Sequence, residues 1–201
     1  MKCYHHKHVI FLVLLSATLV LLTSCSCRRT AATLDDVETY IQSRPDSALA
    51  VIRAIDTTTL TTRSVRARYA LLHSIALDKN WIDTTDVNVV MPAVEYYDRH
   101  PSGLYRAKAY YYLGRIQENG GDLSAASVSL LKSEKYAEGT DDIAFKSLLY
   151  QTISNIYGKV FQMDEALDYT EKSYELALQD GDSLGANASL YCMAKDLNNM
   201  G

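Results

Sequence analysis

Ala107-Lys-Ala-Tyr-Tyr-Tyr-Leu-Gly114, followed by Asn119-Gly-Gly-Asp122, is the stretch whose pattern of residue types returns forty positions later in the chain. The residues that align at this shift share size and polarity: Tyr110 with Tyr150, Leu113 with Ile153, Gly114 with Ser154, Ala126 with Ala166 and Ser133 with Ser173. The shift continues at Leu190, Met193, Ala194 and Leu197. Apolar spacing within each copy is helical, and self-similarity at a fixed period is typical of a helical repeat array.

Within one copy, a large residue is followed by an aliphatic and a small one, and the next helix opens with another small residue. The residues in this order are Tyr110, Leu113, Gly114, Gly121, Ala126 and Leu130. The pattern resembles the tetratricopeptide repeat (TPR). The resemblance implies antiparallel helix pairs that approach closely at Gly114 and Ala126, where Tyr110 and Leu130 fill the adjoining groove.

The period of forty exceeds the common TPR period of about 34, which implies longer helices. Three positions depart from the family pattern. Gln117 occupies a position where the family often has an aromatic residue. Phe161 aligns with Gly121, where the family has glycine, and Thr170 aligns with Leu130.

The chain is therefore predicted to be all-α, a TPR-like α-solenoid of about nine helices. The repeat domain covers 34–201, with weak repeats over 34–100, clearer repeats over 104–140 and 142–180, and an incomplete repeat over 182–201. Because the incomplete repeat lacks a second helix, we expect a truncated chain or a fragment. Asp122 and Asp182 are candidate helix caps, and Gly139 and Gly181 are candidate helix stops.

Three side chains carry further expectations about burial. Trp81 lies in an insertion over 79–89, and we expect it to fold back as a hydrophobic plug rather than to project as a recognition loop. Tyr111 should be exposed, because three consecutive tyrosines cannot all face one side of a helix. Cys192 is expected to be a buried small hydrophobe.

The first 24 residues have the layout of an export signal. A basic start with Lys2 and Lys7 precedes an apolar run of fourteen residues over 9–22, whereas a membrane-spanning helix needs roughly twenty. Leu22-Thr-Ser-Cys25 follows and resembles the lipobox of bacterial lipoproteins. The resemblance implies removal of 1–24, lipidation of Cys25, a tether over 25–33 and a lipid-anchored protein of the bacterial cell envelope that faces the periplasm. The alternative is an ordinary secretory signal with an incidental cysteine.

Composition and motifs exclude several classes of function. Beyond residue 24 the chain carries eighteen basic and twenty-four acidic residues, which argues against nucleic acid as a partner. It contains no Gly-x-Gly-x-x-Gly, Walker or His-Glu-x-x-His motif. We expect no catalytic residues, no metal site and no cofactor.

In TPR folds the first helices line the concave side, and the fifth, ninth and thirteenth positions of each repeat face it. Counting from 107, 147 and 187 gives Tyr111, Arg115 and Asn119; Gln151, Asn155 and Lys159; and Tyr191, Lys195 and Asn199. We call these nine positions the inner stripe. Its basic residues and its asparagine in each repeat suit an extended peptide with acidic groups, and they resemble in part the carboxylate clamp of some TPR proteins. The alternative is a merely solvated face.

The function expected from these features is that of a membrane-anchored interaction scaffold, acting either alone or as the sensory or docking part of a longer regulator. Its partner would be a protein or peptide bound to the concave face. The alternative is a glycan-binding nutrient-uptake lipoprotein of the outer membrane, since some of these lipoproteins embed TPR repeats.

Overall fold

The computed structural model describes residues 28–100 and 102–200, apart from the side chains at 195, 196 and 198–200. Over these residues the chain forms nine α-helices, two 3-10 helices and no strand, which confirms the predicted all-α, TPR-like solenoid. The chain divides into two compact units between Asn80 and Trp81. The first unit contains a helix over 28–40, α2 (Pro45–Arg53), η1 (Thr57–Thr59) and α3 (Arg63–Lys79). The second contains η2 (Val87–Val89), α4 (Met91–Arg99), α5 (Gly103–Asn119), α6 (Leu123–Ala137), α7 (Ile143–Lys159), α8 (Met163–Asp180) and α9 (Ser183–Met200).

The first unit is closed by polar contacts at the helix ends. Pro45 occupies the first turn of α2, where its missing N–H costs nothing. Asn80, after the last residue of α3, donates from Nδ2 to the Pro45 carbonyl at 2.8 Å. The first helix already includes residue 28, and buried Thr30 shares a 2.8 Å hydroxyl bond with Thr59. Part of the stretch predicted as a tether over 25–33 is therefore helical, and the predicted signal over 1–24 lies outside the described residues.

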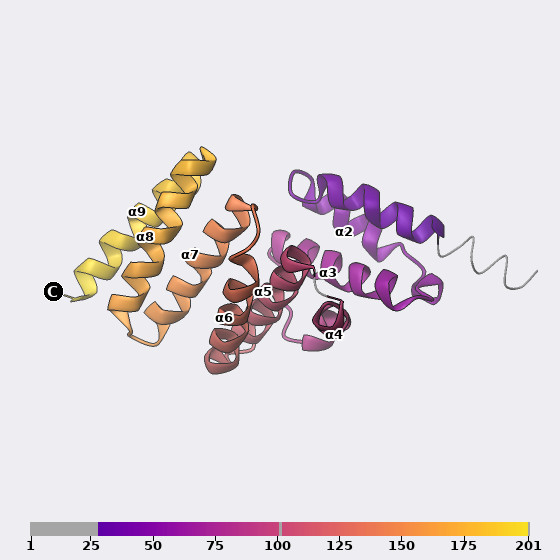
Figure 1. Cartoon of the computed structure of the whole chain (residues 1–201), viewed down its shortest axis with the longest axis horizontal. Coiled ribbons are helices and arrows are strands. Elements are labelled where there is room, and N and C mark those ends of the chain that lie inside the picture. The colour runs from indigo at the N-terminus through magenta and orange to yellow at the C-terminus, as the bar shows by residue number, and fades with distance from the viewer. Residues whose placement is uncertain (1–27, 101, 201) are drawn as a thin grey trace, which may run out of the picture. The chain divides into compact units, whose positions relative to one another are not determined.

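In the second unit, α5 pairs with α6 and α7 pairs with α8, and α9 follows as a further first helix (Figure 1). Carboxylates cap the helix starts as predicted. Asp122 accepts a 2.9 Å bond from the Ala125 amide, and Asp182 accepts one of equal length from the Gly185 amide. Gly181 ends α8 with a left-handed φ of 74°, which glycine adopts without steric cost.

The paired helices touch at small residues, as the repeat register predicts. A Cβ added to Gly114 would lie 2.8 Å from Leu130 Cγ and 3.2 Å from the Ala126 carbonyl oxygen. Forty residues later, the hydroxyl groups of Ser154 and Thr170 meet at 2.6 Å. Thr170 thus replaces the leucine contact with a buried hydrogen bond.

A second small-residue contact recurs at the same shift. Ser133 Oγ in α6 donates to the Ala107 carbonyl in α5 at 2.8 Å, and Ser173 Oγ in α8 donates to the Ser147 carbonyl in α7 at 2.9 Å. Ser147 returns a bond to the Ser173 carbonyl at 3.0 Å. Each buried serine satisfies its hydroxyl on the backbone of the partner helix, so the two helices of a pair are held at close range.

Two burial predictions are corrected. Trp81 is 92% exposed, so the predicted plug is wrong and the side chain projects into solvent. The loop is closed instead by Val90, which is fully buried, and by the Thr84 carbonyl, which accepts a 3.3 Å bond from Asn119 Nδ2. Cys192 is half-buried rather than buried.

Gly114→Leu tests the close contact between α5 and α6. The larger side chain must displace Leu130 and the Ala126 backbone, so we expect the free energy of unfolding to fall by about 1 to 3 kcal/mol. Gly139 has no atom within 4 Å of an added Cβ, so Gly139→Ala is the matched control and should stay within about 0.5 kcal/mol of the parent. Urea denaturation measures both variants, and equal midpoints for Gly114→Leu and the parent would contradict this packing.

Candidate functional site

The structure places the predicted inner stripe on α5, α7 and α9, but it does not make one open surface of it. Asn155, Lys159 and Tyr191 are exposed. Arg115, Asn119 and Gln151 are half-buried, and Tyr111 is buried. The side chains of Lys195 and Asn199 lie outside the described residues.

Tyr111 was predicted to be exposed, and the structure shows it 1% exposed. Its ring meets Phe145 of α7 edge-on at 5.6 Å, and its hydroxyl lies 3.2 Å from Thr152 Oγ1. The prediction fails because α5 is covered on more than one side. Tyr110 packs against Tyr136 of α6 while Tyr111 faces α7, so consecutive tyrosines can all be buried. Tyr111 therefore joins two repeats and is no contact for a partner.

The basic residues of the stripe converge on one carboxylate. The side chain of Glu118 is only 6% exposed, and it accepts a 2.5 Å bond from Arg115 Nη1 through one oxygen and a 2.6 Å bond from Lys159 Nζ through the other. Arg115 comes from α5 and Lys159 from α7, so the carboxylate links the ends of two first helices. Glu118 is not among the predicted site residues. Its position three residues after Arg115 on the same helical face is the signal that identifies it.

Asn119 is also engaged within the protein, through its bond to the Thr84 carbonyl. Arg115 and Asn119 thus serve the packing of the second unit rather than an open clamp. The part of the stripe that is presented to solvent is Asn155, the half-exposed Lys159 and the 73% exposed Tyr191. Amide, ammonium and phenol groups of this kind can hydrogen-bond the backbone of an extended peptide.

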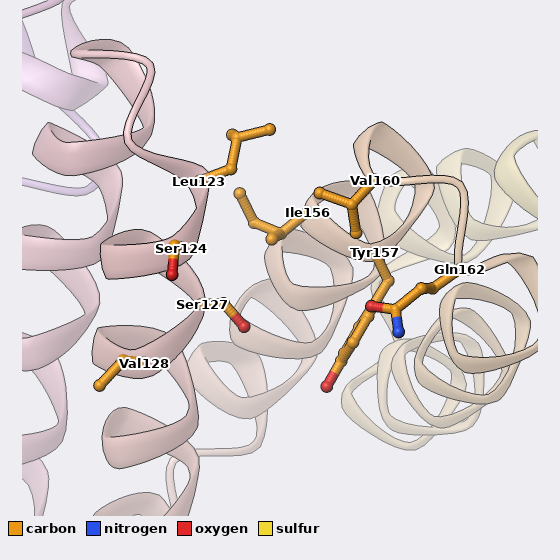
Figure 2. Close-up of a pocket in the computed structure, with 8 residues that line it drawn as sticks. All are labelled: Leu123, Ser124, Ser127, Val128, Ile156, Tyr157, Val160 and Gln162. Atoms are coloured by element: carbon orange, nitrogen blue, oxygen red, sulfur yellow. The ribbon is translucent and has the colours of Figure 1, made fainter.

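A separate apolar groove lies between α6 and α7 (Figure 2). Its volume is about 360 Å³, and Val128 and Val160 on its walls are 55% and 41% exposed. The lining residues are Leu123, Ser124, Ser127, Val128, Ile156, Tyr157, Val160 and Gln162. This groove was not predicted, because its walls come from two successive repeats, α6 on one side and α7 with its following turn on the other.

Tyrosines elsewhere in the second unit donate to carboxylates. Tyr110 Oη donates to Asp98 at 2.7 Å, and burial together with this bond raises the pKa of Tyr110 to about 12. Tyr169 Oη donates to Glu134 at 2.9 Å, and burial and the carboxylate again raise the pKa of the phenol. Both phenols therefore stay protonated near neutral pH.

The described residues contain no group of three or more histidine, cysteine or acidic side chains arranged to hold a metal ion. Among these same residues, no helix combines the length and the apolar character that crossing a membrane requires. Cys25 lies outside the described residues, so its predicted lipidation stays a prediction.

Paired antiparallel helices, small residues at their contacts and a period of forty define the chain as a TPR-like helical repeat protein. No family model and no curated protein matches the sequence. Solved structures to which the chain is similar include the apo form of RapI, with a TM-score of 0.68 and 13% sequence identity. The match covers 85% of this chain and 49% of the RapI chain, so the chain spans about half of that protein's length. At this identity the likeness shows the fold alone.

Glu118→Gln tests the link between α5 and α7. The substitution keeps the shape of the side chain but leaves two cations facing a neutral amide, and we expect a loss of about 1.5 to 3 kcal/mol in unfolding free energy. Lys159→Ala is the comparison, because half-exposed Lys159 should contribute no more than about 1 kcal/mol. Denaturation at low and high salt measures both, and a neutral Glu118→Gln variant would show that the carboxylate does not hold the repeats together.

Proposed function

We propose that the protein is a lipid-anchored, non-catalytic scaffold that binds a protein or peptide on the inner face of its TPR-like array. The observation that carries the proposal is the row of exposed Asn155, Lys159 and Tyr191 on the consecutive first helices α7 and α9. Stacked helix pairs offer an extended surface, and an extended peptide needs polar groups spaced along such a surface.

The charges on this face favour a partner with an acidic group near Lys159. Arg115 and Lys159 both pair with the single carboxylate of Glu118, which gathers two cations in one cluster. Lys159 is its more exposed member, at 52% against 28% for Arg115. An acidic side chain or a terminal carboxylate could bind Lys159 without displacing the buried contacts of Arg115.

The membrane anchor rests on the sequence alone. Leu22-Thr-Ser-Cys25 directly follows an apolar run that is too short to span a bilayer. Lipidation through several acyl chains, each contributing about 0.8 kcal/mol per buried CH₂, would hold the protein on an envelope membrane, with the repeats facing the periplasm.

Cys25→Ala tests the anchor. We expect the variant to fold normally and to be released from the membrane fraction or to retain its signal, because the acceptor thiol is absent. Metabolic labelling with a fatty acid, followed by cell fractionation, measures this. Cys27→Ala is the matched control and should keep its label. Label that persists in Cys25→Ala would contradict the assignment.

The inner-face site is tested by replacing Asn155 and Lys159 together with alanine. Both side chains are exposed, so stability should change little, whereas affinity for an acidic peptide selected on the parent protein should fall about tenfold or more. The effect should shrink at high salt, because salt screens the contact with Lys159.

Lys132→Ala together with Lys135→Ala is the control, since both lysines are exposed on the second helix α6. Equal loss of binding in the two double variants would show a nonspecific charge effect. Selection of glycans rather than peptides on parallel arrays would favour the nutrient-uptake alternative.

A further inference from the structure

The turns that follow α3, α5 and α7 repeat a strained backbone position. Trp81, Gly121 and Phe161 stand forty residues apart and adopt left-handed φ angles of 58°, 82° and 61°. Glycine takes this conformation freely, but in any other residue the Cβ crowds the following carbonyl oxygen and the backbone is strained. Two of the three copies therefore carry an aromatic residue where the backbone favours glycine.

Both aromatic side chains project into solvent. Trp81 is 92% exposed and Phe161 is 85% exposed, and Trp81 is the single tryptophan of the sequence. Neither ring contributes a packing contact that would offset the backbone strain. Strain of this kind persists where it serves a function, and exposed aromatics are the residues that most often anchor protein interfaces.

The three turns lie along one edge of the second unit. The bond from Asn119 to the Thr84 carbonyl places the loop after Trp81 beside the end of α5. The bond from Lys159 to Glu118 then places the end of α7, just before Phe161, beside the same end of α5. In Figure 1 the α5–α6 and α7–α8 turns lie on the same, lower side of the view. We call residues 81–86, 120–124 and 160–165 the turn edge.

The turn edge adjoins the apolar groove of Figure 2. Val160 and Gln162, the two chain neighbours of Phe161, line the groove opposite Leu123 and Val128. An apolar side chain of a partner could enter the groove, and the ring of Phe161 could then pack over that side chain. The edge thus combines aromatic anchors with a recess of about 360 Å³.

The charge of the turn edge specifies the partner. Its three segments contain no lysine, arginine or histidine. They present five exposed carboxylates, those of Asp83, Asp86, Asp122, Asp164 and Glu165. Acidic groups around apolar anchors complement a segment that carries apolar and basic side chains together, and they repel the anionic surface of a lipid bilayer.

We propose that the turn edge is a second docking surface that binds a basic amphipathic helix of a partner protein, with Trp81 and Phe161 as its anchors. The helix would place apolar side chains against the two aromatic rings and in the groove, and basic side chains beside the acidic turns. This surface adjoins the inner stripe at Asn119 and Lys159, but it does not depend on a peptide binding there.

The test uses a synthetic amphipathic helix of leucine and lysine, labelled with fluorescein, and the full chain. Binding is followed by anisotropy of the peptide and by the emission of Trp81, which should shift to the blue as the indole leaves water. We expect Trp81→Ala combined with Phe161→Ala to weaken binding by about tenfold or more. Asp164→Asn with Glu165→Gln should also weaken binding and should reduce its dependence on salt.

Two controls separate docking from a general effect. Leu178→Ala with Leu184→Ala removes two exposed apolar side chains that flank the α8–α9 turn, beside Asp180 and Asp182, and should leave binding unchanged. Phe161→Gly should weaken binding as much as Phe161→Ala, while its urea midpoint should be the higher of the two because glycine adopts the left-handed turn without a steric clash.

The proposal is overturned if the leucine and lysine helix does not bind at millimolar concentration, or if it binds the parent and the Trp81→Ala, Phe161→Ala variant alike. If a helix of leucine and glutamate bound as tightly as the helix of leucine and lysine, the preference of the turn edge for a basic partner would be contradicted. A blue shift with vesicles of phosphatidylcholine and phosphatidylglycerol, but not with the basic helix, would assign the turn edge to a membrane surface instead.

Discussion

The close approach of the two helices in each pair is the constraint on which the rest of the second unit depends. Gly114 leaves no room for a Cβ against Leu130, and Ser173 bonds directly to the Ser147 backbone. These contacts fix the register of α6 on α5 and of α8 on α7. The register then decides which side chains contact the next helix pair and which lie in the turns. The bonds of Arg115 and Lys159 to Glu118 and the exposure of Trp81 and Phe161 both follow from it.

The helices and their pairing could be predicted from the sequence because they depend on local patterns. The helical spacing of apolar residues, the aspartates that cap the helices and the helix stop at Gly181 can each be recognised from a few neighbouring residues in the sequence. The shift of forty residues then aligned the small residues of successive repeats correctly. Contacts between successive pairs could not be predicted in this way. Tyr111 is buried by Phe145, which lies in the next repeat, and a single helical period does not reveal that neighbour.

Trp81 shows the opposite error, since a large apolar residue was expected to be buried and proved to be exposed. Its alignment with Gly121 and Phe161 at the repeat period was the available signal, because a left-handed turn residue at the end of a helix has few neighbours. The inner stripe was predicted as a basic surface without Glu118, whose carboxylate neutralises part of that charge. The choice of partner therefore depends less on the residue types in the inner stripe than on which of its side chains remain exposed once the surrounding helices have packed.

The equivalence of the repeats is tested most directly by paired cysteines in a background in which the native Cys3, Cys25, Cys27 and Cys192 are all replaced by serine. Hydroxyl oxygens of Ser147 and Ser173 lie 3.3 Å apart, close enough for a disulfide when both residues are cysteine. Cysteines at Ala107 and Ser133, forty residues earlier, should form the same bond on mild oxidation, and a pair at Ala107 and Glu134 should not. Cross-linking is read from gel mobility before and after reduction. The account predicts that both in-register pairs close rapidly, whereas closure of the off-register pair, or of only one in-register pair, would contradict it.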